Sequence, residues 1–372
     1  MSRLEELIQE LCPNGVEYKP LSDKTLFAFR YGKGNKIPED TGGQYDVYGA
    51  NGIVSHIDEY NCEDVTIIGH IGAVGLINRV KGKCFVTYNG TIATVVDKEK
   101  VDSQYLYYVL TTLGLPSRKK GSQPFLSVSD FDKIAIPVPP LEVQREIVRI
   151  LDSFTLLTTE LKAELTARKK QYEYYRDELL EALHTEGVEY KKLGDIGQVK
   201  MCKRILKSQT NTIGEIPFYK IGTFGGEANS FISKGLYEEY KEKYSYPKIG
   251  EILISAAGTI GRTVVYDGEP AYYQDSNIVW LSHNESDVLN TFLRYCYELK
   301  PWSISSGGTI PRLYNDNILK AKIPVPPIEV QREIVRILDS FTELTGDLTA
   351  ELTARQKQYE FYRDKLLSFK QL

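Results

Sequence analysis

Residues 137–180 read PVPPLEVQREIVRILDSFTLLTTELKAELTARKKQYEYYRDELL, and residues 324–367 read PVPPIEVQREIVRILDSFTELTGDLTAELTARQKQYEFYRDKLL. The two copies align without a gap and differ at about eight of 44 positions. A repeat this close fixes the architecture before any single motif does. Two copies are too few for a stacked solenoid, so the sequence predicts a protein with two similar halves.

Each copy is predicted to form one long helix. Pro139 and Pro140 are tolerated in a first helical turn, where a missing N–H group costs nothing. The side chains that follow recur at steps of four and three residues, which is the pattern of a coiled-coil seam. The seam residues are Ile147, Leu151, Phe154, Thr158, Leu161, Leu165, Arg168, Tyr172, Tyr175 and Leu179, and Ile334, Leu338, Phe341, Thr345, Leu348, Leu352, Arg355, Tyr359, Tyr362 and Leu366. At about 1.5 Å per residue each helix would span roughly 60 Å. The expected partner of each seam is the other copy; the alternative is a pair of core helices in a globular domain.

Composition indicates a globular protein of a reducing compartment. The chain has 372 residues, 42% hydrophobic and 26% charged, with a net charge of −4. No apolar run approaches the length of a membrane span and no signal-peptide core is present, so we expect a cytoplasmic protein without a membrane partner. The five cysteines are scattered without metal-like spacing, which favours free thiols and no bound metal. The negative net charge argues against a simple basic nucleic-acid binder, although local patches remain available.

The segments between the repeats follow a cyclic order of helix tail, domain, long helix, domain and long helix. VEYK follows both Gly15 and Gly187, so residues 3–11 align with the tail of the first long helix, and Gly15 is expected just after a helix end. We expect an α+β protein with two mixed α/β domains and two long helices that form a pseudo-twofold symmetric, antiparallel coiled coil. The expected boundaries are 1–12 for an N-terminal helix, 13–137 and 187–324 for the domains, and 138–186 and 325–372 for the long helices.

The two domains resemble each other weakly. Ile68, Gly69, Gly72 and Gly75 have the same spacing as Ile254, Ser255, Gly258 and Gly261, and Pro124 and Leu126 match Pro311 and Leu313. Short runs rich in β-branched residues alternate with Gly, Asn and Asp turns, with helical stretches near 103–113 and 286–299. Each domain is therefore predicted to hold a twisted sheet or a partial barrel.

Most catalytic motifs are missing. The sequence contains no P-loop, no G-x-S-x-G elbow, no H-E-x-x-H and no methyltransferase tetrapeptide. Glu17-Tyr18-Lys19 and Glu189-Tyr190-Lys191 supply the second half of a restriction-type nuclease centre, but the first copy lacks an upstream Asp. A structural role is the favoured interpretation, and we expect no catalytic residue on this chain. Loss of a metal-dependent nuclease activity in Glu189→Ala would reverse that interpretation.

Basic clusters with aromatic or Gly/Asn-rich neighbours lie inside both divergent domains. Lys and Arg neutralise phosphates, while Arg and Asn read base edges. Any one cluster alone is typical of a solvated loop, but together they favour nucleic-acid binding because the acidic residues concentrate in the helices. The candidate DNA-binding residues are Arg30, Tyr31, Lys33, Asn35, Lys36, Asn51, Lys119, Lys120, Lys203, Arg204, Lys207, Arg262 and Arg312.

The whole chain resembles the specificity (S) subunit of type I restriction-modification systems. The strongest carriers of the resemblance are IPVPPLEVQREIVRIL at 136–151 and IPVPPIEVQREIVRIL at 323–338, with GTIPRL at 308–313 and a looser GSQPFL in the first half. The resemblance implies two target-recognition domains that each read half of a bipartite double-stranded DNA sequence. It implies an antiparallel spacer that docks two methyltransferase (M) subunits, followed by restriction (R) subunits. S-adenosylmethionine, ATP and Mg²⁺ would then sit on those partners, with no cofactor on this chain.

Two further interpretations stay open at this point. One is a DNA endonuclease or single-chain modification enzyme, which the absent motifs disfavour. The other is a coiled-coil adaptor without a DNA role, which the basic clusters disfavour. If the chain is a specificity subunit, the length of the helix pair would set the gap in the target, and alanine at Arg204 or Arg262 would weaken binding to only one half-site.

Overall fold

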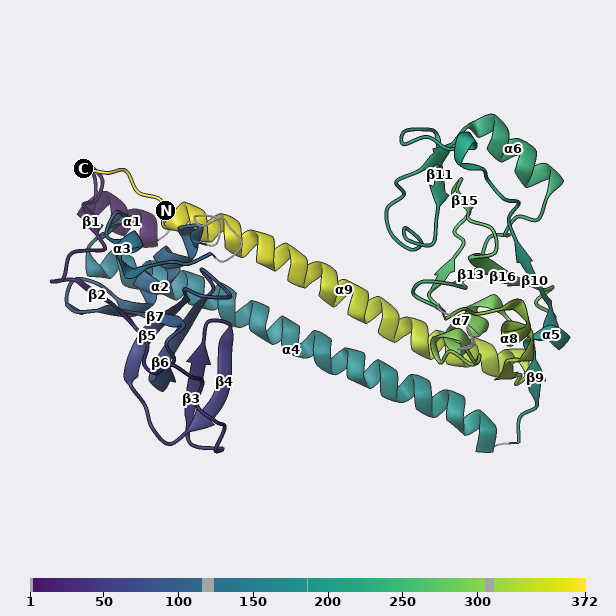
Figure 1. Ribbon diagram of the computed structural model, residues 1–372, viewed down its shortest axis with the longest axis horizontal. Coiled ribbons are helices and arrows are strands. Elements are labelled where there is room, and N and C mark those ends of the chain that lie inside the picture. The colour runs from purple at the N-terminus through teal and green to yellow at the C-terminus, as the bar shows by residue number, and fades with distance from the viewer. Residues whose placement is uncertain (1–2, 116–123, 186, 305–310) are drawn as a thin grey trace. The chain divides into compact units, whose positions relative to one another are not determined.

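The computed structural model describes residues 3–115, 124–185, 187–304 and 311–372 (Figure 1). The chain divides into two compact units. Unit 1 is formed by Met1–Glu164 together with Thr349–Leu372, and unit 2 is formed by Leu165–Leu348. Each unit therefore contains one α/β domain and a segment of both long helices.

Unit 1 is built on a six-stranded sheet with the strand order β2-β7-β5-β6-β3-β4. Its elements are α1 (Arg3–Leu11), β1 (Tyr18–Pro20), β2 (Phe27–Tyr31), β3 (Tyr45–Gly49), β4 (Gly52–Ile57), β5 (Cys62–Gly69), β6 (Ile77–Val86), β7 (Gly90–Val95), α2 (Ser103–Thr112), α3 (Val128–Phe131), β8 (Ala135–Pro137) and the first part of α4 (Leu141–Thr185). Asp102 begins α2 by accepting hydrogen bonds from the N–H groups of Gln104 and Tyr105. Helix α2 packs on β5, β6 and β7, and its buried Tyr105 and Leu106 join Ile68 in one core.

Unit 2 contains a four-stranded sheet, β10-β16-β13-β14, and a three-stranded sheet, β12-β11-β15. Its elements are β9 (Tyr190–Lys192), α5 (Leu193–Ile196), β10 (Gln198–Met201), the 3₁₀ turn η2 (Lys207–Gln209), β11 (Ile216–Tyr219), β12 (Phe231–Ile232), α6 (Lys234–Lys243), β13 (Ile252–Ser255), β14 (Thr263–Val265), β15 (Tyr272–Tyr273), β16 (Ile278–Ser282), α7 (Asn290–Glu298), α8 (Asn315–Lys320), β17 (Lys322–Pro324) and the first part of α9 (Ile328–Leu366). The core strands β13 and β16 are almost wholly buried, as their runs of Ile, Leu, Val and Trp require.

The two domains share one topology, although their sequences resemble each other only weakly. The order β2-β7-β5-β6 of unit 1 matches β10-β16-β13-β14 of unit 2. Strand β3 then pairs in parallel with the end of β6, and β11 pairs in parallel with β15 in the same way. Each domain is also closed by a two-stranded pair, β1 with β8 and β9 with β17. The predicted mixed α/β domains are confirmed.

Helices α4 and α9 run antiparallel. Phe154, early in α4, stacks on Tyr362, late in α9, with ring centroids 5.6 Å apart in unit 1. Tyr175, late in α4, stacks on Phe341, early in α9, at 5.5 Å in unit 2. The seam residues predicted from the 4-3 spacing are buried or half-buried apart from Tyr175, which is 39% exposed. Among the described residues, no helix combines the length and apolarity that crossing a bilayer requires.

The repeat joins each long helix to its domain through the same glutamine. Gln144 is fully buried, donates to Lys100 O at 2.8 Å and to Pro139 O at 2.7 Å, and accepts from Asp102 N–H at 2.9 Å. Gln331, the same position of the second copy, is also fully buried and makes three corresponding bonds at 2.7–2.9 Å. A buried amide with its donors and acceptor satisfied fixes the angle between helix and domain. The two copies of the repeat therefore anchor their helices to their domains in the same way.

The N-terminal and C-terminal segments of the chain are hydrogen-bonded to each other within unit 1. Val16 N–H donates to Lys370 O at 2.9 Å, and Leu372 N–H donates to Val16 O at 3.1 Å. Unit 2 has the continuous counterpart, in which Val188 N–H donates to Leu183 O at 3.3 Å. The expectation that Gly15 directly follows a helix end is wrong, because α1 ends at Leu11. Gly15 instead has φ +118° and passes against the backbone of Lys370, where a side chain would collide.

Candidate nucleic-acid interface

In unit 1, strand ends and loops meet along one edge of the sheet. His70 N–H donates to Asn89 O at 3.2 Å, Leu126 N–H donates to His70 O at 3.1 Å, and Lys33 N–H donates to Val86 O at 2.9 Å. The turn that carries Asn51 joins the same edge, since Tyr48 O, just before it, accepts from Thr87 N–H at 3.0 Å. We call residues 31–36, 48–52, 69–76, 86–90 and 124–127 the loop edge of unit 1.

Unit 2 has a loop edge built by the same backbone bonds. Ala256 N–H donates to Asn277 O at 2.7 Å, and Leu313 N–H donates to Ala256 O at 2.9 Å. These two bonds are the counterparts of the His70 and Leu126 bonds in unit 1. The loop edge of unit 2 comprises residues 201–204, 255–262, 274–277 and 311–314.

The spaced glycines shape both loop edges. Gly72 and Gly75 have φ +80°, and Gly258 and Gly261 have φ +63° and +76°. A residue with a side chain rarely adopts these angles, so the tight turn of the backbone here requires glycine. Gly72 and Gly75 therefore lie in a turn, and Gly258 and Gly261, which have the same spacing, also have positive φ angles.

The structure brings most of the predicted residues of unit 1 to the loop edge or beside it. Arg30 is exposed on β2 and donates to Asn61 O at 3.0 Å. Tyr31 ends β2 with 42% of its side chain exposed. Lys33, Asn35, Lys36 and Asn51 are exposed as well. Lys119 and Lys120 lie outside the described residues.

In unit 2, the predicted residues separate into two groups. Arg204 Nε lies 3.0 Å from Asp275 Oδ2, and Arg312 Nη2 donates to Ser276 O at 2.8 Å, so both arginines gather on one short turn. Lys203 precedes Arg204 in the chain, but its Nζ lies 5.0 Å from the centre of the Tyr244 ring at the end of α6. Arg262 follows the glycine loop but turns its guanidinium to Phe224 O at 2.7 Å. Lys207 is exposed in η2, whose Gln209 contacts Tyr240 of α6 at 3.3 Å.

Sequence reasoning missed the apolar part of the loop edge in unit 1. Ile71 and Phe125 form an isolated β-bridge and are 43% and 44% exposed. Between Phe125 and Tyr31 lies His70, which is buried and lies 3.0 Å through Nδ1 from Thr91 Oγ1. The sequence does carry one signal. Aligning QPFL with IPRL gives Phe125 the same position in its domain as the predicted DNA-binding residue Arg312.

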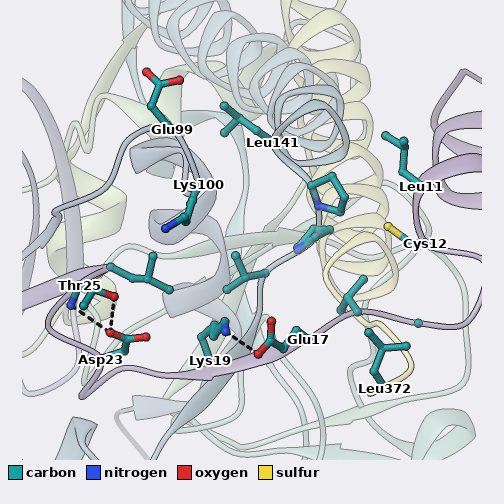
Figure 2. Close-up of a pocket in the computed structure, with 16 residues that line it drawn as sticks. Leu11, Cys12, Glu17, Lys19, Asp23, Thr25, Glu99, Lys100, Leu141 and Leu372 are labelled. Carbon is teal, nitrogen blue, oxygen red and sulfur yellow. Dashed lines mark hydrogen bonds and ion pairs between the residues drawn. The ribbon is translucent and has the colours of Figure 1, made fainter.

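The nuclease-like triplets do not assemble a metal site. Figure 2 shows Glu17 and Lys19 bonded to each other at the wall of a cavity of about 540 Å³. Asp23 lines the same cavity, but its carboxylate accepts from the N–H and hydroxyl of Thr25 at 3.0 and 2.6 Å. In the described part of the chain, no three His, Cys, Asp or Glu side chains gather in a metal-binding arrangement. The Tyr and Lys of each triplet lie in β1 and β9, the strands that close the two domains.

Comparison with known proteins decides the family. Residues 25–168 and 185–355 match the model of the type I restriction modification DNA specificity domain, which covers most of the chain.

The chain belongs to the type I restriction modification DNA specificity family. A Haemophilus influenzae protein assigned as a type I restriction enzyme specificity subunit is 45% identical over 98% of both chains. The EcoR124I/EcoR124II specificity subunit of Escherichia coli is 32% identical over 75% of this chain and 74% of its own. The resemblance stated from the sequence is confirmed.

Solved structures from type I restriction-modification systems share the fold. The type I S subunit from M. genitalium has a TM-score of 0.65 at 16% identity and covers 95% of this chain and 97% of its own. A chain from a type I restriction-modification complex has a TM-score of 0.51 at 18% identity, with 97% and 96% covered. The predicted fold class is confirmed, and DNA specificity rather than catalysis is the contribution of this family.

Proposed function

We propose that this specificity subunit reads a bipartite double-stranded DNA target, one half-site with each loop edge. The observation that carries the proposal is the contrast between a shared framework and different exposed side chains. Both loop edges are held by the same backbone bonds, while Phe125 in unit 1 corresponds to Arg312 in unit 2. A common framework with different side chains suits two half-sites of different sequence. In this proposal, residues 13–137 and 187–324 are the target-recognition domains.

Positive charge at the loop edges supports contact with DNA despite the net charge of −4. Lys33 follows β2, and Lys203 follows β10 at the corresponding place, and both side chains are exposed. Ammonium groups beside a duplex neutralise phosphates and release counterions, whichever bases are present. Arg204 and Arg312 have guanidinium groups that match the acceptor pattern of guanine in the major groove. Lysines would position the chain and arginines would read the sequence.

The repeated helices would recruit two methyltransferase subunits in equivalent ways. Tyr174 and Phe361 occupy the same position of the two copies and are 60% and 62% exposed. Leu157 and Leu344 form a second matched pair, 37% and 41% exposed. Matched exposed apolar side chains favour identical docking of one partner on each half. Restriction subunits would join this assembly in the cytoplasm, and S-adenosylmethionine, ATP and Mg²⁺ would bind to the partners.

The test is DNA binding by the complex with its methyltransferase, after the target has been defined from methylated genomic bases. Three duplexes are needed: the intact target and two targets with one half-site scrambled. Loss of one bidentate arginine contact costs about 1–3 kcal/mol, so we expect Arg312→Ala to weaken binding to the intact target by about tenfold. Discrimination should be lost in the second half-site alone. Arg204→Ala should act on the same half-site.

The matched control is Arg336→Ala. Arg336 is an exposed arginine of α9 that is bonded to Glu333 and lies outside both loop edges. Its loss should leave binding within about twofold of wild type, the range of an ordinary surface substitution. Unchanged binding of both Arg204→Ala and Arg312→Ala would remove the loop edge of unit 2 from the interface. Equal loss of discrimination at both half-sites would contradict the division of labour.

A further inference from the structure

The two loop edges differ at three corresponding positions. In unit 1, Thr91 pairs with Ile68 on one side and with Tyr31 on the other. In unit 2, Val279 pairs with Ile254 and with Met201 in the same manner. The strand register therefore makes Met201 the counterpart of Tyr31. The Leu126 and Leu313 bonds make Ala256 and Arg312 the counterparts of His70 and Phe125.

Unit 1 fills these positions with a rigid aromatic group. The His70 ring lies 4.8 Å from the Tyr31 ring and 5.4 Å from the Phe125 ring, which meets it edge-on at 83°. Tyr31 is fixed further, because its hydroxyl accepts from Val128 N–H at 3.1 Å. Phe125 is also held by its β-bridge to Ile71. Phe125 and Ile71 thus present exposed carbon surface on a framework with little freedom to move.

This apolar surface carries no charge of its own and shares the loop edge with exposed lysines. Burial lowers the pKa of His70, which keeps the imidazole neutral near pH 7. Lys33 and Lys36, in the loop that follows Tyr31, are exposed. An apolar patch on a loop edge that also carries exposed lysines suits the major groove, where the 5-methyl group of thymine is the apolar element of the base edges.

At the position where unit 1 has the apolar Phe125, unit 2 has a hydrogen-bond donor, Arg312. Arg312 is half-buried, donates through Nη2 to Ser276 O at 2.8 Å, and lies 5.9 Å over the Tyr314 ring. An anchored guanidinium loses little freedom on binding, and its fork matches O6 and N7 of guanine.

We propose that Phe125 and Ile71 read a thymine methyl group in the first half-site, whereas Arg312 reads a guanine in the second. The proposal rests on the proposed function, because it assigns base classes to the two loop edges. The structure favours contact of Phe125 with a methyl group over insertion of its ring as a wedge between base pairs. Phe125 keeps more than half of its surface covered and is held by a β-bridge, so little of the ring protrudes.

Deoxyuridine provides the sharpest test, because it removes only the methyl group from thymine. In the complex with methyltransferase, each thymine of the first half-site is replaced in turn and the dissociation constant is measured. One replacement should weaken wild-type binding about fourfold, the worth of one buried methyl group. The same replacement should not change the dissociation constant of Phe125→Ala. In Phe125→Leu, part of the wild-type sensitivity to deoxyuridine should return. Thermal unfolding of both variants verifies that they are folded.

A parallel arm tests Arg312. Replacing the guanines of the second half-site by 7-deazaguanine removes the N7 acceptor and should weaken wild-type binding by about fivefold, part of a bidentate contact. Arg312→Ala should be insensitive to this replacement. Deoxyuridine in the second half-site should leave Phe125→Ala and wild type equally affected.

Several outcomes would overturn the inference while the proposed function stands. A bipartite target whose first half-site lacks thymine is one of them. Others are indifference of wild type to every deoxyuridine, or a methyl effect of equal size in Phe125→Ala. Unstacking of a neighbouring 2-aminopurine in the absence of a methyl effect would favour a wedge instead. Failure of the proposed function would look different, because no split target would be found at all.

Discussion

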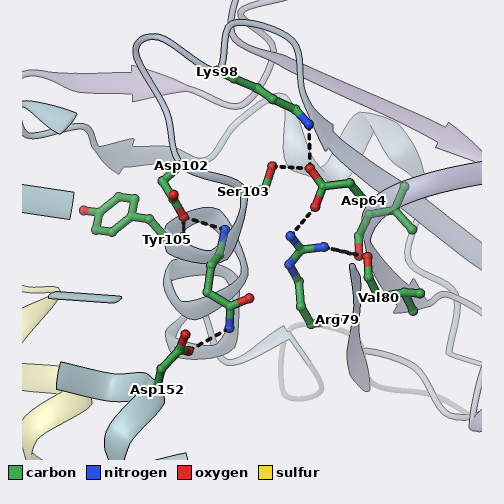
Figure 3. Close-up of polar contacts among 10 residues, drawn as sticks. Asp64, Arg79, Val80, Lys98, Asp102, Ser103, Tyr105 and Asp152 are labelled. Atoms are coloured by element: carbon green, nitrogen blue, oxygen red, sulfur yellow. Dashed lines mark hydrogen bonds and ion pairs between the residues drawn. The ribbon is translucent and has the colours of Figure 1, made fainter. Parts of the chain in front are cut away.

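At the scale of single residues, Asp64 holds the sheet of unit 1 to helix α2 (Figure 3). It lies at a bulge in β5, in the left-handed region with φ +53°. Its carboxylate accepts from Arg79, from Lys98 Nζ at 2.6 Å and from Ser103 Oγ at 3.1 Å. Burial alone would raise the pKa of Asp64, but the bonds from Lys98 and Arg79 outweigh it and lower the pKa to about 2.

Replacement of Asp64 by Asn should destabilise unit 1 in a pH-dependent way. Asn tolerates the backbone angle, so the main loss is the charge opposite Arg79, whose side chain is only 9% exposed. We expect a cost of about 2 kcal/mol near pH 7, less than for a fully buried pair because Lys98 is exposed. The carboxylate contributes fully above its unfolded pKa of about 3.9 and loses its contribution as the pH falls toward the folded value.

Urea unfolding of wild type and Asp64→Asn at several pH values measures this difference. The gap in unfolding free energy should be constant from pH 7 to pH 5 and shrink below about pH 4. A gap that stays constant down to pH 3 would show that Asp64 acts through shape and not through charge.

At the scale of elements, helix α1 makes the two repeat copies unequal. Val143 and Val330 occupy the same position of the repeat, yet Val143 is fully buried and Val330 is 39% exposed. Glu146 and Glu333 differ likewise, with 8% and 56% of their side chains exposed. Leu4 of α1 belongs to the same buried cluster as Val143. Helix α1 thus buries this part of the first copy.

Aspartate at these two positions should therefore have opposite consequences. Val143→Asp places an unpaired carboxylate in a core beside Glu146 and should cost about 3 kcal/mol or more. Val330→Asp places the same group at an exposed site in the first turn of α9, where the helix dipole favours it, and should stay within about 0.5 kcal/mol. Thermal unfolding of both variants measures the contrast. Equal losses would mean that α1 does not cover the first copy.

The sequence predicted the elements whose pattern is local. The 4-3 spacing, the paired prolines and the spaced glycines each act within a few residues, so the long helices and the glycine turns could be derived from them. The strand order could not, because pairing of β3 with β6 or of β11 with β15 joins segments far apart in the chain. The candidate site was predicted by charge, which found Arg204 and Arg312. An exposed Phe125 has no charge to reveal it and becomes evident only beside His70.

At the scale of the whole molecule, the shared topology of the two domains and the repeated helices describe one unit used twice. The chain ends complete the cycle in unit 1 through Val16 and Lys370, where unit 2 has a continuous chain. Paired helices of fixed length would give the two half-sites a fixed gap. The gap should then depend on the number of residues in α4 and α9 and not on the loop edges.

Lengthening the helices should lengthen the gap. Four residues inserted near Leu165 and four near Leu352 add about 6 Å to each helix. At about 3.4 Å per base pair, the gap should grow by one to two base pairs, with both half-sites unchanged. A gap that stays the same would contradict the role of the helices as a ruler.

The most direct test of the central claim is a map of methylated bases in cells that express this chain with its cognate methyltransferase. The account predicts two short specified sequences separated by an unspecified gap of constant length. One continuous motif, or two specified sequences at variable distance, would contradict the claim that each domain reads its own half-site at a fixed spacing.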